Sequence, residues 1–260
     1  IFDRKNATPL HFACRFNSID CVRLFLTHQA TIDRQDASGN TPLHCIALSQ
    51  QIIENHMDEN DLLKITIVHM LLNAAKDYRQ FYLEIENKDK KTALSIACEY
   101  GNINLIRILL IYGANIHNSM PIHMAIKSGN IDIVQLLLEY QVKLILTNIY
   151  LETSLHIACK YNRIDVLQIL INYQNENIDL EVRDYHGYTP LLTASYFNHQ
   201  HCINILLMNK ADITASDNYG KNILHICVEQ HCQDALQICL EWIKKDIHSY
   251  DIFMKDDRHG

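Results

Sequence analysis

The sequence is poor in the residues that interrupt regular structure. Its 260 residues include only four prolines and seven glycines, while 48% of them are hydrophobic. This composition excludes collagen-like chains and low-complexity disorder, and it indicates a folded chain with a substantial core. No apolar run approaches the roughly 18 residues that a membrane-spanning helix needs. We therefore expect no direct membrane insertion by this segment.

The chain also has fewer basic than acidic residues. The chain carries 23 Lys and Arg against 30 Asp and Glu, which gives a formal net charge of −7. Non-specific binding to nucleic acid depends on a surplus of Lys and Arg that neutralises phosphates. We therefore expect a partner other than nucleic acid.

The nine cysteines are not arranged as a disulfide framework, because their number is odd and they are scattered. Free thiols predict a reducing compartment, the cytosol or the nucleus, and of these we expect the cytoplasm. Two His/Cys clusters, at 199–202 and 225–239, lack the paired Cys-x-x-Cys spacing of zinc sites. The chain also has no P-loop, dinucleotide-binding loop or nucleophile elbow. We therefore predict no metal, no cofactor and no catalytic residue.

What the sequence does contain is an internal repeat. Thr8-Pro9-Leu10-His11 returns as Thr41-Pro42-Leu43-His44, and weaker versions follow. We call these four-residue segments slots, and successive slots begin 33, 51, 28, 33, 36 and 33 residues apart. Each is followed by two short apolar segments, which predict a pair of helices. The slots begin at Thr8, Thr41, Thr92, Met120, Thr153, Thr189 and Asn222.

The slot residues suit the start of a helix. Threonine is a good N-cap, proline fits the first helical position, and leucine enters the core. Histidine occupies the fourth place in five of the seven slots. A histidine at one repeated position favours a hydrogen-bonding strut between repeats over a zinc or catalytic site. Cysteine also recurs at one position, which predicts core packing, at Cys14, Cys98 and Cys159.

Turn signals precede the slots, for example Asp36 to Gly39, Asp184 to Gly187 and Asp217 to Gly220. Slot, helix pair and turn together resemble the ankyrin repeat over the whole chain, and in that family the turns form projecting fingers. The resemblance implies one all-α domain over 1–260, a solenoid of about seven helix-turn-helix repeats with β-hairpin fingers. The repeats would start near 3, 36, 87, 118, 148, 184 and 217. A further turn at 256–260 predicts that the array is part of a longer one.

The period is broken in three places. We expect 13 extra residues between the helices of the second repeat, roughly Gln50 to Lys64, with Asp58 or Asp61 capping a lengthened second helix. Five more, about Ala75 to Phe81, would lengthen the next finger. Leu110 to Met120 is five residues short, so that finger should be reduced. Glu241 to Phe253 overshoots by about seven residues.

Exposed tyrosines make the best candidate binding surface, because tyrosine supplies contact area at low entropic cost. One set ends the first helix of a repeat, and another sits in the fingers. Charged finger residues would set selectivity at the rim. The predicted partner-binding residues are Arg34, Asp36, Tyr100, Tyr150, Tyr161, Tyr185, Tyr188, Phe197, Tyr219 and Lys221.

A narrower resemblance covers two or three repeats. The segments 187–194, 204–207 and 217–225, with the lengthened repeat after them, are similar to the cytosolic ankyrin array of TRPA-type cation channels. The resemblance implies a regulatory or tethering role in such a channel. The family's electrophile-sensing cysteines lie in a linker that has no match here.

Two classes of function remain open from the sequence. The first is a non-catalytic scaffold that binds another protein, or another segment of the same parent protein, in an adaptor or a secreted microbial effector. The second is the cytosolic regulatory domain of a channel. An enzyme elsewhere in the parent chain, with this array recruiting its substrate, is a third possibility.

Overall fold

The computed structural model describes residues 3–49, 59–173 and 178–245. The expected orphan finger at 256–260 and Asp58 lie outside these residues. The chain divides into two compact units, Ile1–Val142 and Lys143–Gly260. Each unit is a stack of helix pairs.

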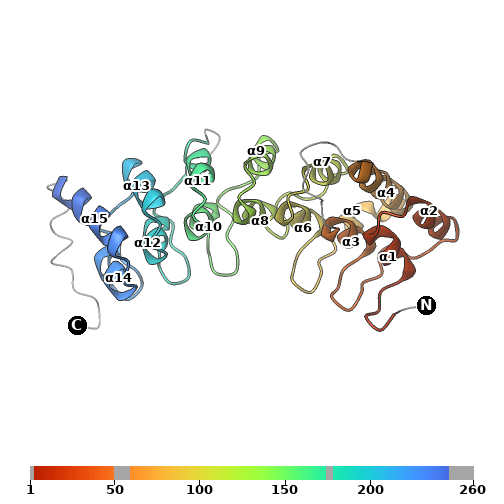
Figure 1. The fold of residues 1–260 in the computed structure, drawn as a ribbon, viewed down its shortest axis with the longest axis horizontal. Coiled ribbons are helices and arrows are strands. Elements are labelled where there is room, and N and C mark those ends of the chain that lie inside the picture. The colour runs from red at the N-terminus through yellow and green to blue at the C-terminus, as the bar shows by residue number, and fades with distance from the viewer. Residues whose placement is uncertain (1–2, 50–58, 174–177, 246–260) are drawn as a thin grey trace. The chain divides into compact units, whose positions relative to one another are not determined.

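In both units a short first helix is followed by a second helix that runs back along it (Figure 1). The pairs of the first unit are α1 (Pro9–Arg15) and α2 (Ile19–Thr27), α3 (Pro42–Leu48) and α4 (Glu59–Ala75), α6 (Ala93–Glu99) and α7 (Ile103–Ile111), and α8 (Pro121–Ser128) and α9 (Ile131–Glu139). The pairs of the second unit are α10 (Ser154–Lys160) and α11 (Ile164–Ile171), α12 (Pro190–Tyr196) and α13 (Gln200–Met208), and α14 (Ile223–Glu229) and α15 (Gln233–Lys245).

The slots begin the first helices, as the sequence predicts. Threonine is the N-cap of α1, α3, α6, α10 and α12, and asparagine takes its place before α14. The third slot residue is buried in six of the seven repeats, and Leu224 of the last repeat is half-buried. The recurring cysteines Cys14, Cys98 and Cys159 are also fully buried, which confirms their place in the core. These small and branched side chains let adjacent pairs approach closely.

The fingers are turns that precede the slots and project from one edge of each stack (Figure 1). In the finger before α12, the Asp184 carboxylate accepts the backbone N–H groups of His186 and Tyr188, both at 2.8 Å. Gly187 closes the turn with a φ of 82°, in the left-handed region that glycine adopts without strain. Within the described residues, strand pairing is limited to one isolated bridge, between Ser216 and Asn222.

The same finger geometry forms without the Asp-x-x-Gly signature. Asn87 and Asn148 replace the aspartate and accept the equivalent pairs of N–H groups at 2.9 to 3.1 Å. Lys90 and Leu151 replace the glycine, each with a φ of 59°. An asparagine side chain therefore supports this turn as well as an aspartate does, with one negative charge fewer.

The extra residues 75–81 form helical structure, and the expectation that they lengthen a finger is wrong. A 3₁₀ turn (η1, Lys76–Tyr78) and α5 (Arg79–Leu83) follow α4 directly. Tyr82 and Leu83 of α5 are 1% and 2% exposed. Burial of these two side chains fixes the segment as a helix against the stack.

The lengthened second helix of the second repeat is confirmed as α4, with 17 residues. Asp61 is the third residue of α4, so it is not the residue directly before the helix, and its carboxylate accepts the Asn104 amide at 3.0 Å. The short link before α8 contains a tight turn, in which the Asn118 backbone N–H donates to the Asn115 carbonyl at 3.2 Å. At the other end, α15 has 13 residues and extends to Lys245, while 246–253 lie outside the described residues.

Candidate interaction surfaces

Three of the five slot histidines are hydrogen-bonding struts between repeats. The His11, His44 and His156 Nε2 atoms lie 2.9 to 3.1 Å from the carbonyls of Asn40, Lys91 and Tyr188, each in the next repeat. In each case Nδ1 faces the slot threonine, whose backbone N–H and hydroxyl both lie within 3.2 Å. The carbonyl requires a proton on Nε2, so Nδ1 is the acceptor and the ring is neutral.

Burial reinforces this neutral state. It lowers the pKa of His44 to about 4, although the Lys91 carbonyl and Asp36 act in the opposite direction. Burial likewise lowers the pKa of His156, because a charged ring loses hydration in the stack. The described residues contain no group of three His, Cys, Asp or Glu side chains that would hold a metal ion. Burial also raises the pKa of the Cys14 and Cys98 thiols, which opposes the thiolate that nucleophilic chemistry needs.

In the second unit the fingers are joined to one another. The Tyr150 carbonyl accepts the Tyr185 N–H at 2.9 Å, and the His186 carbonyl accepts the Asn218 N–H at 3.1 Å. The Asn218 side chain adds a bond to the Tyr185 carbonyl at 3.0 Å. These bonds hold the three fingers as one row, so their tyrosines are presented on a fixed backbone.

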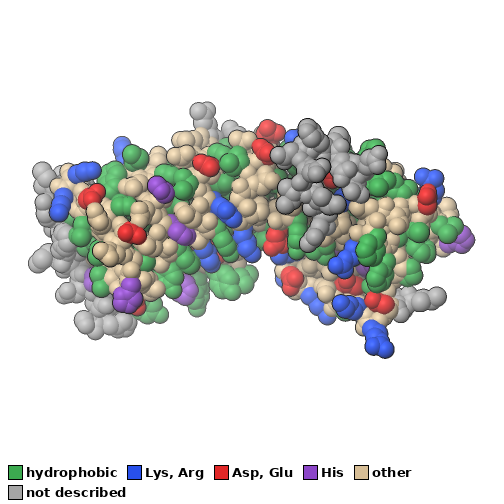
Figure 2. Space-filling model, viewed as in Figure 1, with side chains coloured by type: hydrophobic (Ala, Val, Ile, Leu, Met, Phe, Trp, Pro, Cys, Tyr) green, Lys and Arg blue, Asp and Glu red, His purple; other side chains and the backbone are tan. Residues whose placement is uncertain are grey.

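The first helices and this row enclose a hollow of about 400 Å³, which we call the finger groove. It combines aromatic rings with charged side chains, a combination typical of specific binding sites. Hydrophobic side chains gather at the edge where these fingers project, below α10 and α12 in Figure 2. The finger groove is lined by Tyr150, Glu152, Lys160, Asp184, His186, Tyr188, Thr193, Tyr196 and Phe197.

A pair of residues eight positions apart recurs along one wall of the stacks. The first member directly precedes a slot, and the second ends the first helix. In three repeats the pair is ionic: Lys91 with Glu99, Glu152 with Lys160 at 2.7 Å, and Lys221 with Glu229 at 3.0 Å. In the repeat between the last two, it is Tyr188 with Tyr196, whose ring centroids are 5.8 Å apart. The second unit thus carries an aromatic pair between two ion pairs.

The aromatic pair extends into a longer cluster. The Tyr196 ring meets Phe197 edge-on at 5.0 Å, and Phe197 stacks on His199 at 6.0 Å. Burial raises the pKa of Tyr188 to about 12, and the negative charges of Asp217, Glu229 and Asp184 act in the same direction. The ring therefore lies in a negative field, which favours an approaching cation.

The structure brings three of the predicted binding residues together and leaves the others apart. Tyr150, Tyr188 and Phe197 line the finger groove. The exposed rings of Tyr185 and Tyr219 lie on the joined fingers beside it. Lys221 was predicted as a rim charge, and the structure shows it paired with Glu229. Tyr161 is 38% exposed at the end of α10, outside the groove lining.

The remaining predicted residues belong to the first unit. Asp36 and Tyr100 line a separate hollow with Arg15 and Phe16. Arg34 is exposed on the loop between α2 and α3. Six lining residues of the finger groove are absent from the predicted binding residues, and the eight-residue pairing is the signal that would have found three of them, Glu152, Lys160 and Tyr196. The other three are Asp184, His186 and Thr193.

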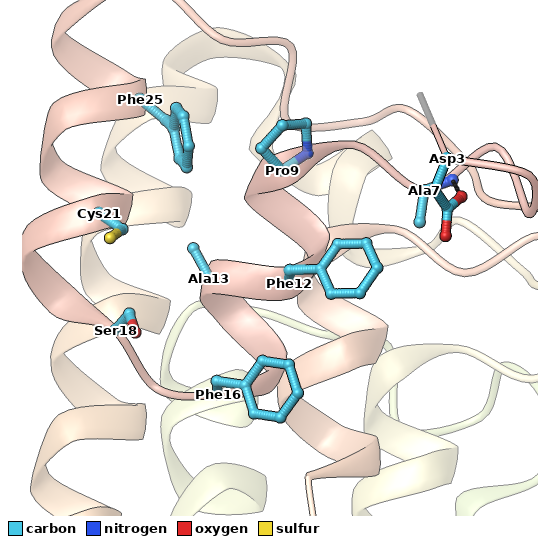
Figure 3. Close-up of a pocket in the computed structure, with 9 residues that line it drawn as sticks. All are labelled: Asp3, Ala7, Pro9, Phe12, Ala13, Phe16, Ser18, Cys21 and Phe25. Carbon is cyan, nitrogen blue, oxygen red and sulfur yellow. Dashed lines mark hydrogen bonds between the residues drawn. The ribbon is translucent and has the colours of Figure 1, made fainter. Parts of the chain in front are cut away.

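The first unit also has an open apolar pocket of about 520 Å³ at α1 and α2. Figure 3 shows Phe12 of α1, Phe16 directly after α1, and Phe25 of α2 around it. Phe12 is 43% and Phe16 71% exposed. Asp3 is its one charged lining residue. The finger groove offers more polar and charged contacts, so it is the better candidate for specific recognition.

A family model described as "Ankyrin repeats (3 copies)" matches residues 2–55, 57–148 and 155–251. The crystal structure of the human ASB11 ankyrin repeat domain superimposes with a TM-score of 0.70. The match covers 90% of this chain and 98% of that one at 20% sequence identity, a likeness of fold alone. Within the described residues, no helix is both long enough and apolar enough to span a bilayer.

The curated relatives are mostly much longer proteins. The human "Transient receptor potential cation channel subfamily A member 1" is 26% identical over 235 residues, which cover 86% of this chain and 20% of the channel. Human Inversin is 28% identical over 110 residues, 42% of this chain and 9% of Inversin. The putative ankyrin repeat protein FPV223 of fowlpox virus is 34% identical over 126 residues, 46% of this chain and 74% of that protein.

Proposed function

This chain belongs to the ankyrin-repeat family, and we propose that it is a non-catalytic scaffold of a larger protein. It binds another protein, or another segment of its parent, through the finger groove and the tyrosines beside it. Ankyrin repeats are in general protein–protein interaction modules. The proposed scaffold uses no cofactor and has no catalytic residue. It does not bind nucleic acid, in keeping with the net charge of −7. We also propose a cytoplasmic location.

The observation that carries the proposal is the exposure of tyrosines on a hydrogen-bonded row. Tyr150, Tyr185 and Tyr219 are 55%, 66% and 53% exposed, and the bonds between their fingers fix their backbones. A partner that covers these rings gains apolar burial without first ordering the loops that carry them. This is the arrangement expected of binding anchors.

A capture experiment tests this surface. The chain, immobilised and exposed to lysate of its source organism, is compared with the double variant Tyr185→Ser, Tyr219→Ser. We expect the amount of specifically captured protein to fall roughly ten-fold or more, since anchor residues typically contribute 2 kcal/mol or more. The matched control is Tyr78→Ser, Tyr140→Ser, two rings of the first unit with 42% and 44% exposure. Undiminished capture by the finger variant would refute the surface.

The channel assignment is a second candidate, favoured by the 26% identity to the human channel along 86% of this chain. In that case the array would regulate or tether a membrane pore from its cytosolic side. The sequence of the parent gene on both sides of this segment decides between the two. Six apolar spans downstream support the channel, and an uninterrupted polar sequence contradicts it.

A further inference from the structure

We propose that the finger groove receives an arginine side chain from an extended segment of the partner protein. The inference rests on the proposed function and names the chemistry that the groove recognises. Three features of the second unit carry it: the aromatic pair, the surrounding negative charge, and a buried hydroxyl that faces no acceptor or donor.

The aromatic pair supplies flat faces for a planar cation. Tyr188 and Tyr196 have ring centroids 5.8 Å apart with an interplanar angle of 44°. Tyr196 remains 36% exposed, so the pair is open to an incoming group. A guanidinium stacks on such rings and keeps its N–H groups free for hydrogen bonds in its own plane. This preference for a planar cation selects arginine over lysine.

The charges around the pair are complementary to a cation. Within the groove, Lys160 is already engaged at 2.7 Å by Glu152, which leaves Asp184 as the additional charge. Asp217 and Glu229 are also close enough to act on the Tyr188 ring, and Lys221 offsets Glu229. Three acidic side chains, Asp184, Asp217 and Glu229, thus act on the Tyr188 ring, and Lys221 offsets one of them. The remaining negative charge favours a positive ligand.

Thr193 adds a polar side chain to the lining of the groove. It lines the hollow on α12, is 4% exposed, and its hydroxyl has no hydrogen-bond partner among the described residues. A buried hydroxyl without a partner is costly, so such groups usually mark a position where a ligand or water bonds. A guanidinium N–H that displaces the atoms now covering this oxygen would satisfy it. The hollow of about 400 Å³ is in the size range of binding pockets.

The test is a titration followed by NMR of tyrosine rings and threonine methyls. The probe is a seven-residue glycine–serine peptide with one central arginine, and its partner peptide carries citrulline, which has the same shape without the charge. We expect the arginine peptide to shift Tyr188, Tyr196 and Thr193 saturably. The citrulline peptide should bind roughly ten-fold more weakly or worse, as expected for loss of a charge-assisted contact.

Matched variants separate binding from folding. Asp184→Asn removes a charge and keeps the turn, as Asn87 and Asn148 show at the equivalent positions, and it should weaken the arginine peptide several-fold. The same change in the first unit, Asp36→Asn, should leave the affinity unaltered. Tyr196→Phe should retain binding, and Tyr196→Leu should lose most of it. Unchanged thermal melting of each variant shows that the fold is intact.

Equal binding of the arginine and citrulline peptides overturns the inference, and so does tighter binding of a matching glutamate or leucine peptide. Absence of any shift in the groove overturns it as well. The capture experiment stands apart from these outcomes. If capture depends on Tyr185 and Tyr219 while the groove binds the arginine and citrulline peptides equally, the arginine contact is refuted and the scaffold function is retained.

Discussion

At the scale of single residues, three slot histidines, His11, His44 and His156, each link two repeats with one ring. Nδ1 accepts hydrogen bonds within its own helix start, and Nε2 donates one to the next repeat. Both nitrogens are used only when the ring is neutral and carries its proton on Nε2. Protonation would place a second N–H against the threonine donors and leave them without an acceptor. The stability of the stack therefore depends on pH.

His44 gives this coupling a definite direction. Its pKa in the folded chain is about 4, below the ordinary value near 6.5, so the unfolded chain binds the extra proton first. The stabilisation is fully present above about pH 6.5 and is lost as the pH falls toward 4. We expect a loss of about 1.4 kcal/mol per pH unit and about 3 kcal/mol in total.

Urea unfolding at several pH values measures this dependence. The variant His44→Gln should be less stable at neutral pH and should lose part of the acid slope, while the exposed control His201→Gln should follow the wild type. An unchanged slope in His44→Gln would contradict the buried neutral ring.

At the scale of elements, α5 is the segment that departs most from the repeat. It is anchored by burial of Tyr82 and Leu83 and by polar contacts to α4 and to the turn after α7. The Arg79 side chain donates to the Leu72 carbonyl at 2.8 Å, and the Gln80 amide donates to the Gly113 carbonyl at 3.0 Å. The insertion is thereby part of the packed first unit.

Two adjacent aromatic residues of α5 test this packing. Tyr82→Ala should lower the free energy of unfolding by about 3–5 kcal/mol, because it empties a fully buried aromatic site. Phe81→Ala, beside it and 68% exposed, should stay within about 0.5 kcal/mol of the wild type. Chemical denaturation of both variants provides the measurement, and equal effects would show that α5 is not docked.

The contrast between α3 and α5 shows what can be predicted from sequence. Helix α3 begins with Thr41 and Pro42, whose capping and backbone preferences act locally, so its start is readable from four residues. Helix α5 has no such signal, and it forms because Tyr82 finds a buried site supplied by distant residues. Local chemistry predicted the regular helices, and tertiary packing decided the inserted one.

The candidate site divides in the same way. Composition and position predicted Tyr150, Tyr188 and Phe197 as binding residues, and these three line the finger groove. Two of them are tyrosines of predicted turns, and the third is an aromatic residue at the end of a predicted first helix. Tyr196 was not predicted as a binding residue. It lies at the end of α12, whereas the ring it contacts, Tyr188, lies eight residues earlier, before the helix begins. The two rings meet only when the turn folds back onto the end of α12.

At the scale of the whole molecule, each repeat is stabilised mainly by its immediate neighbours. The chain also divides into two compact units at Val142. A substitution that destabilises one repeat should therefore affect that repeat and its neighbours. The destabilisation should not spread through all repeats as it would in a single cooperative core.

Hydrogen exchange makes this prediction measurable. His44→Ala should reduce amide protection in α1 to α7 by about ten-fold, for a loss near 1.4 kcal/mol, with little change in α12 to α15. His156→Ala should produce the reverse pattern. Equal loss of protection in both units, for either variant, would show that the chain unfolds as one cooperative body.

The strut histidines have a consequence for how such a chain changes through evolution. Each ring reaches forward to a backbone carbonyl, an acceptor that almost any residue offers, and always to the repeat that follows it. Because this contact always runs from one repeat to the next in the same direction, it can be repeated along the chain without limit. A duplicated repeat therefore inherits a donor for its successor and an acceptor for its predecessor. Gene duplication would lengthen such an array without any compensating mutation at the new junction.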